Sequence, residues 1–333
     1  MFIIVEGPDG SGKSSLVDEV ARQAAEKYPD RKIVRFHMGR PEEESREWCL
    51  RTWVGTIEGT NWHYDKIVIS DRWHWGEITY APIKRPHTCK DEYGLLGVAG
   101  WRFVELALLS RGAVQFAVIQ PAHVLAERVG ARGDDFVKVE ELTKIRELYD
   151  FGIQQAARIE IVSPPPDSKA SIPAIAEWML ETARHRERET EVLPMFPEYI
   201  GPAKPSALLV GDKRNGEDYT TLPFYPINGN SGEYLLSNLP SPYWKNIGIV
   251  NGSEICGGRL HLLWQALGSP RVVALGRLAE KSIKKDSIPA DKVSVVPHPQ
   301  YVRRFHHKDA AEYGQAIQRL STATNPEDRW TLR

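Results

Sequence analysis

Short apolar runs alternate along the first part of the chain with longer stretches in which apolar positions recur at helical spacing. The runs are Phe2–Val5, Lys32–Phe36, Ile67–Ser70 and Val114–Ile119. After the first run, residues 16–27 carry apolar side chains three and four positions apart, which predicts an amphipathic helix. Because short continuous apolar runs are typical of strands buried on both faces, the alternation predicts an α/β fold with a parallel sheet between two layers of helices.

A change in composition separates this part of the chain from the remainder. Residues 184–191 are densely charged. Prolines then interrupt the chain at Pro194, Pro197, Pro202 and Pro205. Apolar runs resume at Ala207–Val210, Ile247–Val250, Val272–Leu275 and Val293–Val296. One interpretation is a long internal loop, but the new apolar runs favour a second core. We therefore predict one domain at residues 1–190, a linker at 191–205 and a second α/β domain at 206–325.

Composition and charge exclude some classes of protein and leave the partner open. The 333 residues are 41% hydrophobic and 26% charged, with a formal net charge of −1, so there is no overall basic footprint for nucleic acid or membrane. Cys49, Cys89 and Cys256 are far apart and form no C-x-x-C, which favours a reducing compartment over disulfides or zinc. With no signal-like or membrane-spanning apolar segment, we expect a cytoplasmic protein without a membrane partner. The oligomeric state stays open, with a homodimer among the alternatives.

The strongest motif lies between the first apolar run and the first predicted helix. Gly7–Ser14 reads GPDGSGKS and fits the phosphate-loop pattern G-x-x-x-x-G-K-[ST]. We expect Lys13 to reach the β- and γ-phosphates and Ser14 to ligate magnesium, so ATP and Mg²⁺ are the predicted cofactors. The alternative interpretation is a glycine-rich turn between strand and helix that binds no phosphate. The predicted nucleotide-binding residues are Gly7, Pro8, Asp9, Gly10, Ser11, Gly12, Lys13, Ser14 and Ser15.

Charged residues follow two other predicted strands. Asp71 and Arg72 come directly after Ile67–Ser70, at the edge of the sheet where parallel α/β folds bind ligands. Arg128 and Arg132 lie four positions apart in a stretch that also contains glycines, as in a mobile lid that closes over phosphates. A solvent-exposed helix end with ordinary surface charge explains these two arginines equally well.

The order and spacing of these motifs resemble those of thymidylate kinases over about residues 1–190. The similarity rests on Glu6–Ser14, Asp71–Trp73, Tyr80, Arg128, Arg132–Asp134 and Tyr149. It implies transfer of phosphate from ATP to a thymidine-like nucleotide, with Arg72 holding the acceptor's phosphate and Asp9 and Asp71 near the acceptor and the metal. The catalytic residues that it implies are Lys13, Asp9, Asp71, Arg72, Arg128 and Arg132, and the metal ligands are Ser14 and Asp71. The sequence departs from the family at Phe36–Pro41, where the usual proline-containing acceptor stretch is replaced, and its acceptor region is rich in tryptophan.

The second part of the chain resembles the uracil-DNA glycosylase superfamily over roughly residues 203–325. The similarity rests on a strand that enters Gly211-Asp212, a Pro-Phe and Ser-Gly stretch, a strand ending in Asn251, and a terminal His298-Pro299 loop followed by arginines. It implies that Phe224 stacks on a pyrimidine, Asn251 reads its edge, and His298 contacts its carbonyl. Lys213–Asn215 replaces the family's usual turn, and the cysteine ligands of the iron-sulfur branch are absent from the sequence. Taken alone, His298 fits an ordinary loop histidine better than a catalytic one.

The fusion of these two parts is the best indication of the acceptor. A kinase for free nucleotides needs no module that reads a base in a duplex, whereas chemistry on such a base requires it to be flipped out of the stack. The combination resembles the 5-hydroxymethyluracil DNA kinases of bacterial viruses, and it implies 5-hydroxymethyl-deoxyuridine in DNA as acceptor, in the host cytoplasm. Two alternatives stay open: a kinase for free thymidylate or a modified deoxyuridylate, and a DNA glycosylase or DNA-binding protein with a vestigial kinase domain. The predicted partner is therefore a pyrimidine deoxynucleotide or DNA that contains a modified pyrimidine.

Overall fold

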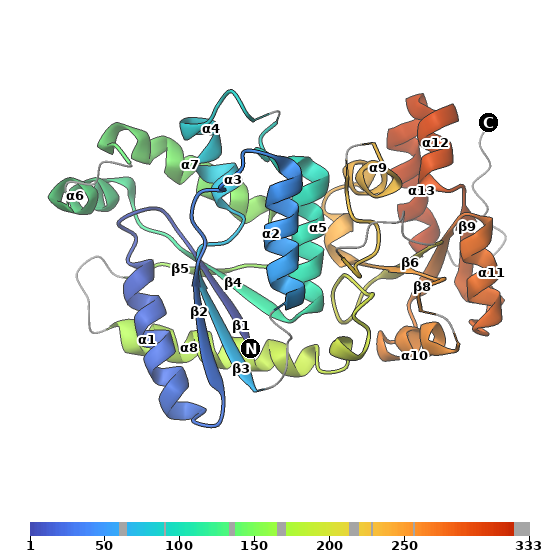
Figure 1. Cartoon of the computed structure of the whole chain (residues 1–333), viewed down its shortest axis with the longest axis horizontal. Coiled ribbons are helices and arrows are strands. Elements are labelled where there is room, and N and C mark those ends of the chain that lie inside the picture. The colour runs from blue at the N-terminus through green and yellow to red at the C-terminus, as the bar shows by residue number, and fades with distance from the viewer. Residues whose placement is uncertain are drawn as a thin grey trace. The chain divides into compact units, whose positions relative to one another are not determined.

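The computed structural model describes residues 1–59, 65–89, 91–132, 137–164, 171–212, 220–227, 229–255 and 257–322. The chain forms two compact units, whose elements are labelled in Figure 1. Residues 1–97 and 111–189 form the first unit, and residues 98–110 together with the chain from Thr190 onward form the second. None of the helices in the described ranges is long and apolar enough to cross a membrane.

The first unit is built on a parallel five-stranded sheet. Its strands are β1 (Phe2–Glu6), β2 (Lys32–His37), β3 (Lys66–Asp71), β4 (Ala113–Val118) and β5 (Glu160–Val162), in the order β2-β3-β1-β4-β5. The sequence predicted the first four, and the structure confirms the parallel α/β fold. In the register between β1 and β3, Val5 lies opposite Asp71. The residues that follow β1 and β3 therefore emerge side by side at the carboxyl edge of the sheet.

Helices cover the sheet of the first unit. They are α1 (Lys13–Lys27), α2 (Arg46–Gly59), α3 (Gly76–Thr79), α4 (Ala81–Lys84), α6 (Ala122–Arg132), α7 (Leu142–Gln155) and α8 (Ile172–Glu189), with a 3-10 turn η1 (Val139–Glu141). Ile3 of β1 packs with Leu16 of α1 and Met179 of α8 in one buried cluster below the sheet (Figure 1). Each is at most 1% exposed, and full burial of such side chains contributes roughly 1.5–3 kcal/mol apiece. The apolar face of α1 thus anchors this helix, which begins within the phosphate loop, against the sheet.

The second unit contains a parallel four-stranded sheet. Its strands are β6 (Ala207–Gly211), β7 (Ile247–Asn251), β8 (Arg271–Leu275) and β9 (Val293–Val296), in the order β7-β6-β8-β9. Its helices are α5 (Gly97–Ser110), α9 (Ser231–Asn238), α10 (Arg259–Ala266), α11 (Arg277–Lys285), α12 (Pro299–Phe305) and α13 (Ala310–Thr322). The 3-10 turns are η3 (Leu193–Met195), η4 (Tyr243–Asn246), η5 (Ala290–Lys292) and η6 (His307–Asp309). The second parallel α/β fold expected from the sequence is therefore present.

Two segments lie elsewhere than the sequence placed them. Helix α5, expected inside domain 1–190, belongs to the second unit, where buried Arg102 donates hydrogen bonds to the carbonyls of Leu236 and Leu239 at 2.6 and 2.7 Å. Residues 191–205, expected as a linker, are part of the second core, since the side chains of Leu193 and Tyr199 are fully buried in it. Apolar periodicity identifies a helix or a buried segment, but it does not say against which sheet the segment packs.

Candidate active site

The phosphate loop, residues 7–14, joins β1 to α1 at the carboxyl edge of the first sheet. Gly10 has φ 80° and Gly12 has φ 94°, in the left-handed region that glycine adopts without strain. A Cβ on Gly10 would also lie 3.3 Å from the Leu125 carbonyl oxygen, so this position is tight. Gly12 precedes α1 and has no side chain that could cap the helix. Uncapped N–H groups at a helix N-terminus are what binds a phosphate anion.

Lys13, the first residue of α1, lies in the interior of the loop. It is 6% exposed, and its Nζ is 3.5 Å from Oδ1 of Asp9. Burial lowers the pKa of Lys13, and neighbouring Arg72 lowers it further, while Asp9 and Asp71 act in the opposite direction. Charges in such a desolvated position interact with a polyphosphate much more strongly than charges in water.

Ser14 and Asp71 form a pair of oxygen ligands next to the loop. The Ser14 hydroxyl donates to Oδ2 of Asp71 at 3.1 Å, and Oδ1 of Asp71 is buried without a hydrogen-bond partner within the described part of the chain. The described residues contain no cluster of three or more His, Cys, Asp or Glu that could hold a metal by itself. Mg²⁺ commonly takes one or two protein oxygens and completes its shell with waters and phosphates, so this pair fits it. These are the two residues that the sequence assigned to the metal.

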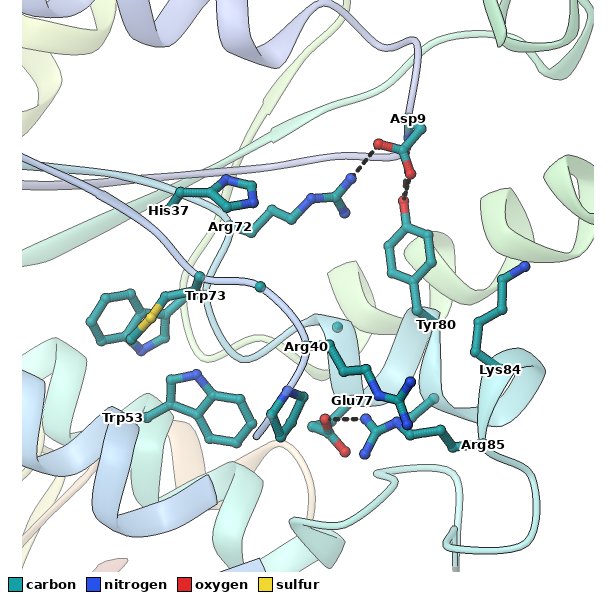
Figure 2. A pocket seen from close by; sticks show the side chains of 15 residues that line it. Asp9, His37, Arg40, Trp53, Arg72, Trp73, Glu77, Tyr80, Lys84 and Arg85 are labelled. Carbon is teal, nitrogen blue, oxygen red and sulfur yellow. Dashed lines mark hydrogen bonds and ion pairs between the residues drawn. The ribbon is translucent and has the colours of Figure 1, made fainter. Parts of the chain in front are cut away.

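Arg72 connects the phosphate loop to two tyrosines. Its Nη2 donates to Oδ1 of Asp9 at 2.5 Å, and its guanidinium lies over the ring of Tyr80, 4.8 Å from the centroid (Figure 2). Its Nη1 lies 3.4 Å from the Tyr149 hydroxyl. Tyr80 in turn donates to Oδ2 of Asp9 at 3.0 Å, and Tyr149 donates to the Gly7 carbonyl at 2.8 Å. Burial alone would raise the pKa of Asp9, but Arg72 and Lys13 hold it below its usual value. The carboxylate is therefore ionised and fixed in position.

The backbone of Arg72 is also unusual. Its φ is 71°, in the left-handed region that costs a side-chain-bearing residue roughly 1–2 kcal/mol. Its N–H is held by the Val5 carbonyl at 2.9 Å, at the start of the turn that leaves β3. Strained residues of this kind cluster at ligand-binding sites, where the surrounding structure holds them in place.

Glu6, the last residue of β1, is a buried carboxyl directly beneath the loop. It is fully buried, and its Oε1 accepts a hydrogen bond from the Trp73 N–H at 2.7 Å. Burial raises the pKa of Glu6 to about 8, and Arg72, the first opposing influence, compensates only in part. In the sequence Glu6 belongs to the family motif but has no assigned role, since nothing in the motif reveals how deeply it is buried.

The two predicted lid arginines differ in their surroundings. Arg128 of α6 donates from Nη1 to the Gly10 carbonyl at 3.0 Å, so it already contacts the phosphate loop. Arg132 is exposed at the C-terminal end of the same helix. Gly133 and Asp134, which the sequence also placed in the lid, lie outside the described residues. The geometry thus brings Arg128, and not Arg132, into the site.

A pocket of about 400 Å³ opens next to Asp9 and Arg72. Figure 2 shows Asp9, Arg72 and Tyr80 at one end and Trp53, Glu77 and Arg85 at the other. The further lining residues are His37, Met38, Gly39, Arg40, Pro41, Trp73, Gly76, Ala81 and Lys84. The volume lies within the usual range for small-molecule sites, and the mixture of flat apolar side chains with a few polar groups is typical of them.

Several lining residues were not predicted from the sequence. They are Trp53 of α2, Glu77 of α3, Lys84 of α4, and Arg85, which directly follows α4. These residues belong to no common sequence motif. The signals that could have found them are the abundance of tryptophan in this region and the replacement stretch Phe36–Pro41, which contributes five of its six residues to the pocket wall.

Comparison with known proteins finds similarities among solved structures. A scan against protein-family models finds no match, and a search of curated proteins also finds none. Among solved structures, the YorR protein of Bacillus subtilis, in complex with phosphorylated GDP, is 21% identical, with a TM-score of 0.42 over 56% of this chain and 98% of that one. The shikimate kinase of Acinetobacter baumannii, in complex with shikimate, is 14% identical, with a TM-score of 0.31 over 56% of this chain and 93% of that one. At this distance neither similarity identifies a substrate.

The three base-binding residues expected in the second unit all lie at the carboxyl edge of its sheet. Phe224 and Asn251 both lie against Gly211: a Cβ there would be 2.1 Å from the Phe224 ring and 2.8 Å from Oδ1 of Asn251. Asn251 is 1% exposed and donates from Nδ2 to Glu254 at 3.3 Å. Phe224 is 8% exposed and has φ 54°. The structure therefore brings these two side chains together through the absence of a side chain at Gly211.

His298 caps α12 at the end of β9. Its Nδ1 accepts a hydrogen bond from the Gln300 N–H at 3.2 Å, and its Cβ lies 3.1 Å from where a Cβ on Gly276 would be. Burial lowers the pKa of His298, against the opposing charge of Asp212. A neutral imidazole whose Nδ1 accepts carries its proton on Nε2, which is then a donor. Lys213–Asn215, where the sequence departs from the glycosylase pattern, lie outside the described residues.

Proposed function

We propose that the first unit is an ATP-dependent kinase that transfers the γ-phosphate to a thymidine-like pyrimidine, and that its preferred acceptor is 5-hydroxymethyl-deoxyuridine in DNA. The transfer would be a step in the modification of viral DNA bases. The observation that carries the proposal is the pocket of about 400 Å³, which ends at Asp9 and Arg72. Asp9 is in turn 3.5 Å from the phosphate-loop Lys13. An acceptor in this pocket would place its reacting oxygen beside the γ-phosphate.

The charged and polar residues around the phosphate loop have separate tasks in this scheme. Lys13 and the loop amides bind the β- and γ-phosphates, and Arg128, already at Gly10, moves onto the transferring group. Ser14 and Asp71 would hold Mg²⁺, which would neutralise negative charge on the phosphates. Fixed positive charges of this kind stabilise the transition state because they need no reorganisation when charge develops.

The transfer step itself is a simple displacement. The acceptor oxygen attacks the γ-phosphorus, the new P–O bond forms as the bond to the β–γ bridging oxygen breaks, and ADP leaves. With a hydroxymethyl acceptor, the hydroxyl proton goes to the Asp9 carboxylate, which Arg72 and Lys13 keep ionised. Tyr80, which donates to the same carboxylate, keeps it oriented toward the pocket.

We assign the capture of the flipped base in DNA to the second unit, which would present the base to the kinase. Phe224 would stack on the pyrimidine, Asn251 would pair with its edge, and Nε2 of His298 would donate to a carbonyl. The support is that Phe224 and Asn251 converge on Gly211. Stacking on an aromatic side chain tolerates many bases, whereas amide and imidazole hydrogen bonds discriminate among them.

A kinase for free thymidylate or a modified deoxyuridylate is the second candidate. One observation favours it: Arg72 lies at the pocket end next to the phosphate loop, where it could hold an acceptor phosphate directly. A vestigial kinase fits less well, because Lys13, Ser14 and Asp71 are all present, and the last two are in direct contact.

Labelled ATP distinguishes the candidates. The protein is incubated with γ-labelled ATP and, separately, with free thymidylate, a thymine-containing duplex and a 5-hydroxymethyluracil-containing duplex. Label in the modified duplex alone supports the proposal. Label in free thymidylate with none in DNA supports the second candidate, and label in none of the three contradicts both.

A further inference from the structure

A buried ion pair forms the wall of the pocket at the end away from the phosphate loop. Nη2 of Arg85 donates to Oε1 of Glu77 at 2.6 Å, and the two side chains are 6% and 1% exposed. The second oxygen of Glu77 accepts a hydrogen bond from the Leu95 N–H at 3.1 Å. Glu77 is thus occupied on both oxygens, and its role is to hold the guanidinium of Arg85 in place (Figure 2).

Arg85 retains a donor that the protein does not use. Its Nη1 is buried and has no hydrogen-bond partner in the part of the chain that the structure describes. Arginine stays protonated in proteins, and a buried donor without an acceptor is unfavourable. Because Arg85 lines the pocket, a bound molecule could supply the missing acceptor.

The charge of this region indicates the kind of acceptor. Glu77 neutralises Arg85, and Arg40, the next cation in the wall, is paired with Glu44. A neutralised arginine with a spare NH₂ group suits the oxygen of a neutral group, such as a ring carbonyl, better than an anion, whose charge would remain uncompensated. Trp53 and Trp73, which are 4% and 2% exposed, give the same pocket flat apolar walls that suit an aromatic ring.

We propose that Arg85 determines the specificity of the pocket for the acceptor ring, by donating from Nη1 to a carbonyl oxygen of a pyrimidine. Glu77 is a positioning residue that orients Arg85 and cancels its charge. The inference rests on the function proposed for the first unit and adds the group through which the ring is recognised. A ring that lacks this carbonyl leaves Nη1 unpaired, and sites that hydrogen-bond a substrate group reject analogues without it strongly.

The test pairs changes in the protein with changes in the ring. Binding of thymidylate, its 2-thio and 4-thio analogues and 5-methyldeoxycytidylate is measured by equilibrium dialysis with Mg²⁺ and ADP present, both as free nucleotides and within a short duplex. Sulfur is a weak acceptor, so replacing the contacted oxygen should weaken binding to the unaltered protein by about tenfold. The same replacement should have no effect on the Arg85→Gln variant, because there the hydrogen bond is already lost.

Two further variants keep this experiment decisive. Arg85→Gln leaves Glu77 buried without its partner, so the double variant Glu77→Gln/Arg85→Gln, which buries no charge, repeats the measurement in case the single variant does not fold. Arg31→Gln removes a different partly buried ion pair of the same unit, with Glu187, and should retain the full preference of the unaltered protein.

The outcomes separate this inference from the proposed function. Loss of binding on replacement of either the 2- or the 4-oxygen, in the unaltered protein but not in the Arg85 variants, supports the inference and identifies the carbonyl. Equal sensitivity in the unaltered protein and the variants overturns it, as does a failure of thymidylate to bind in either form. If the carbonyl effect is present but no phosphate is transferred to any acceptor, the proposed function fails while the recognition of the ring stands.

Discussion

Removing the Arg72 side chain should weaken acceptor binding without abolishing ATP binding. Nη2 of Arg72 is 2.5 Å from Oδ1 of Asp9, and the two side chains are 16% and 19% exposed, so this is a mostly desolvated, charge-assisted contact. In this desolvated position a charge-assisted hydrogen bond from Arg72 to a phosphate of the acceptor contributes about 1.5–3 kcal/mol, so its loss corresponds to roughly a 10- to 150-fold rise in the KM for the acceptor. Steady-state kinetics with varied acceptor at saturating ATP measure this rise.

Because Arg72 has a left-handed backbone, two substitutions can separate the effect of losing its side chain from the effect of backbone strain. Arg72→Ala and Arg72→Gly both lose the guanidinium, but only glycine adopts φ 71° without strain. The glycine variant should therefore be more stable than the alanine variant by roughly 1 kcal/mol in thermal unfolding, while both show the same rise in KM.

Two other arginines serve as comparisons. Arg128→Ala should chiefly lower kcat, because Arg128 contacts the phosphate loop at Gly10 and does not line the pocket. Arg35 lies on edge strand β2 and forms an exposed ion pair with Asp18. Arg35→Ala removes this ion pair and should change neither kcat nor the KM for the acceptor. An acceptor KM within about twofold of normal in both Arg72 variants would refute the role assigned to Arg72.

Three further changes test other parts of the structure. Lys13→Ala should abolish phosphoryl transfer and leave the circular dichroism spectrum unchanged, and a near-normal rate would remove the phosphate loop from the mechanism. Glu6 keeps its proton in the folded state up to about pH 8, whereas the unfolded chain releases it near pH 4.5, so stability should fall as pH rises between these values. Urea unfolding should show this slope, roughly 1.4 kcal/mol per pH unit at most, in the unaltered protein and not in Glu6→Gln. Asn251→Ala should weaken action on modified DNA by about 1–3 kcal/mol and leave acceptor-independent ATP hydrolysis unchanged; an equal loss of both would contradict its assignment to the base.

Local features of the fold could be predicted from the sequence. β1 to β4 and the four strands of the second unit lie within one residue of the expected apolar runs, because short β-branched runs specify buried strands locally. The phosphate loop could also be placed, since its glycines and its lysine are consecutive in the chain. The close approach of Ser14 to Asp71 follows from strand register, because β1 and β3 are parallel neighbours.

Features that depend on long-range packing could not be predicted. The apolar pattern of α5 gives no sign that its buried Arg102 finds acceptors at Leu236 and Leu239. The pocket also depends on long-range packing, because Trp53 and Arg85 come from separate helical segments and only the tertiary structure places them in one wall. The sequence placed the boundary of the first domain after the charge run, and the first unit ends there, at Glu189. That the charge run forms the last turns of α8, and that its Glu187 binds Arg31, could not be predicted.

The most direct test of the central claim is mass spectrometry of nucleosides from DNA treated with the full chain and ATP. A duplex with 5-hydroxymethyluracil is incubated with the unaltered protein or with Lys13→Ala and then digested, and its nucleosides are compared with those from a thymine duplex. We predict a phosphorylated hydroxymethyl nucleoside with the unaltered protein alone and from the modified duplex alone. Unmodified nucleosides from every reaction, together with phosphorylation of free thymidylate by the same preparation, would contradict the claim that the acceptor is a base in DNA.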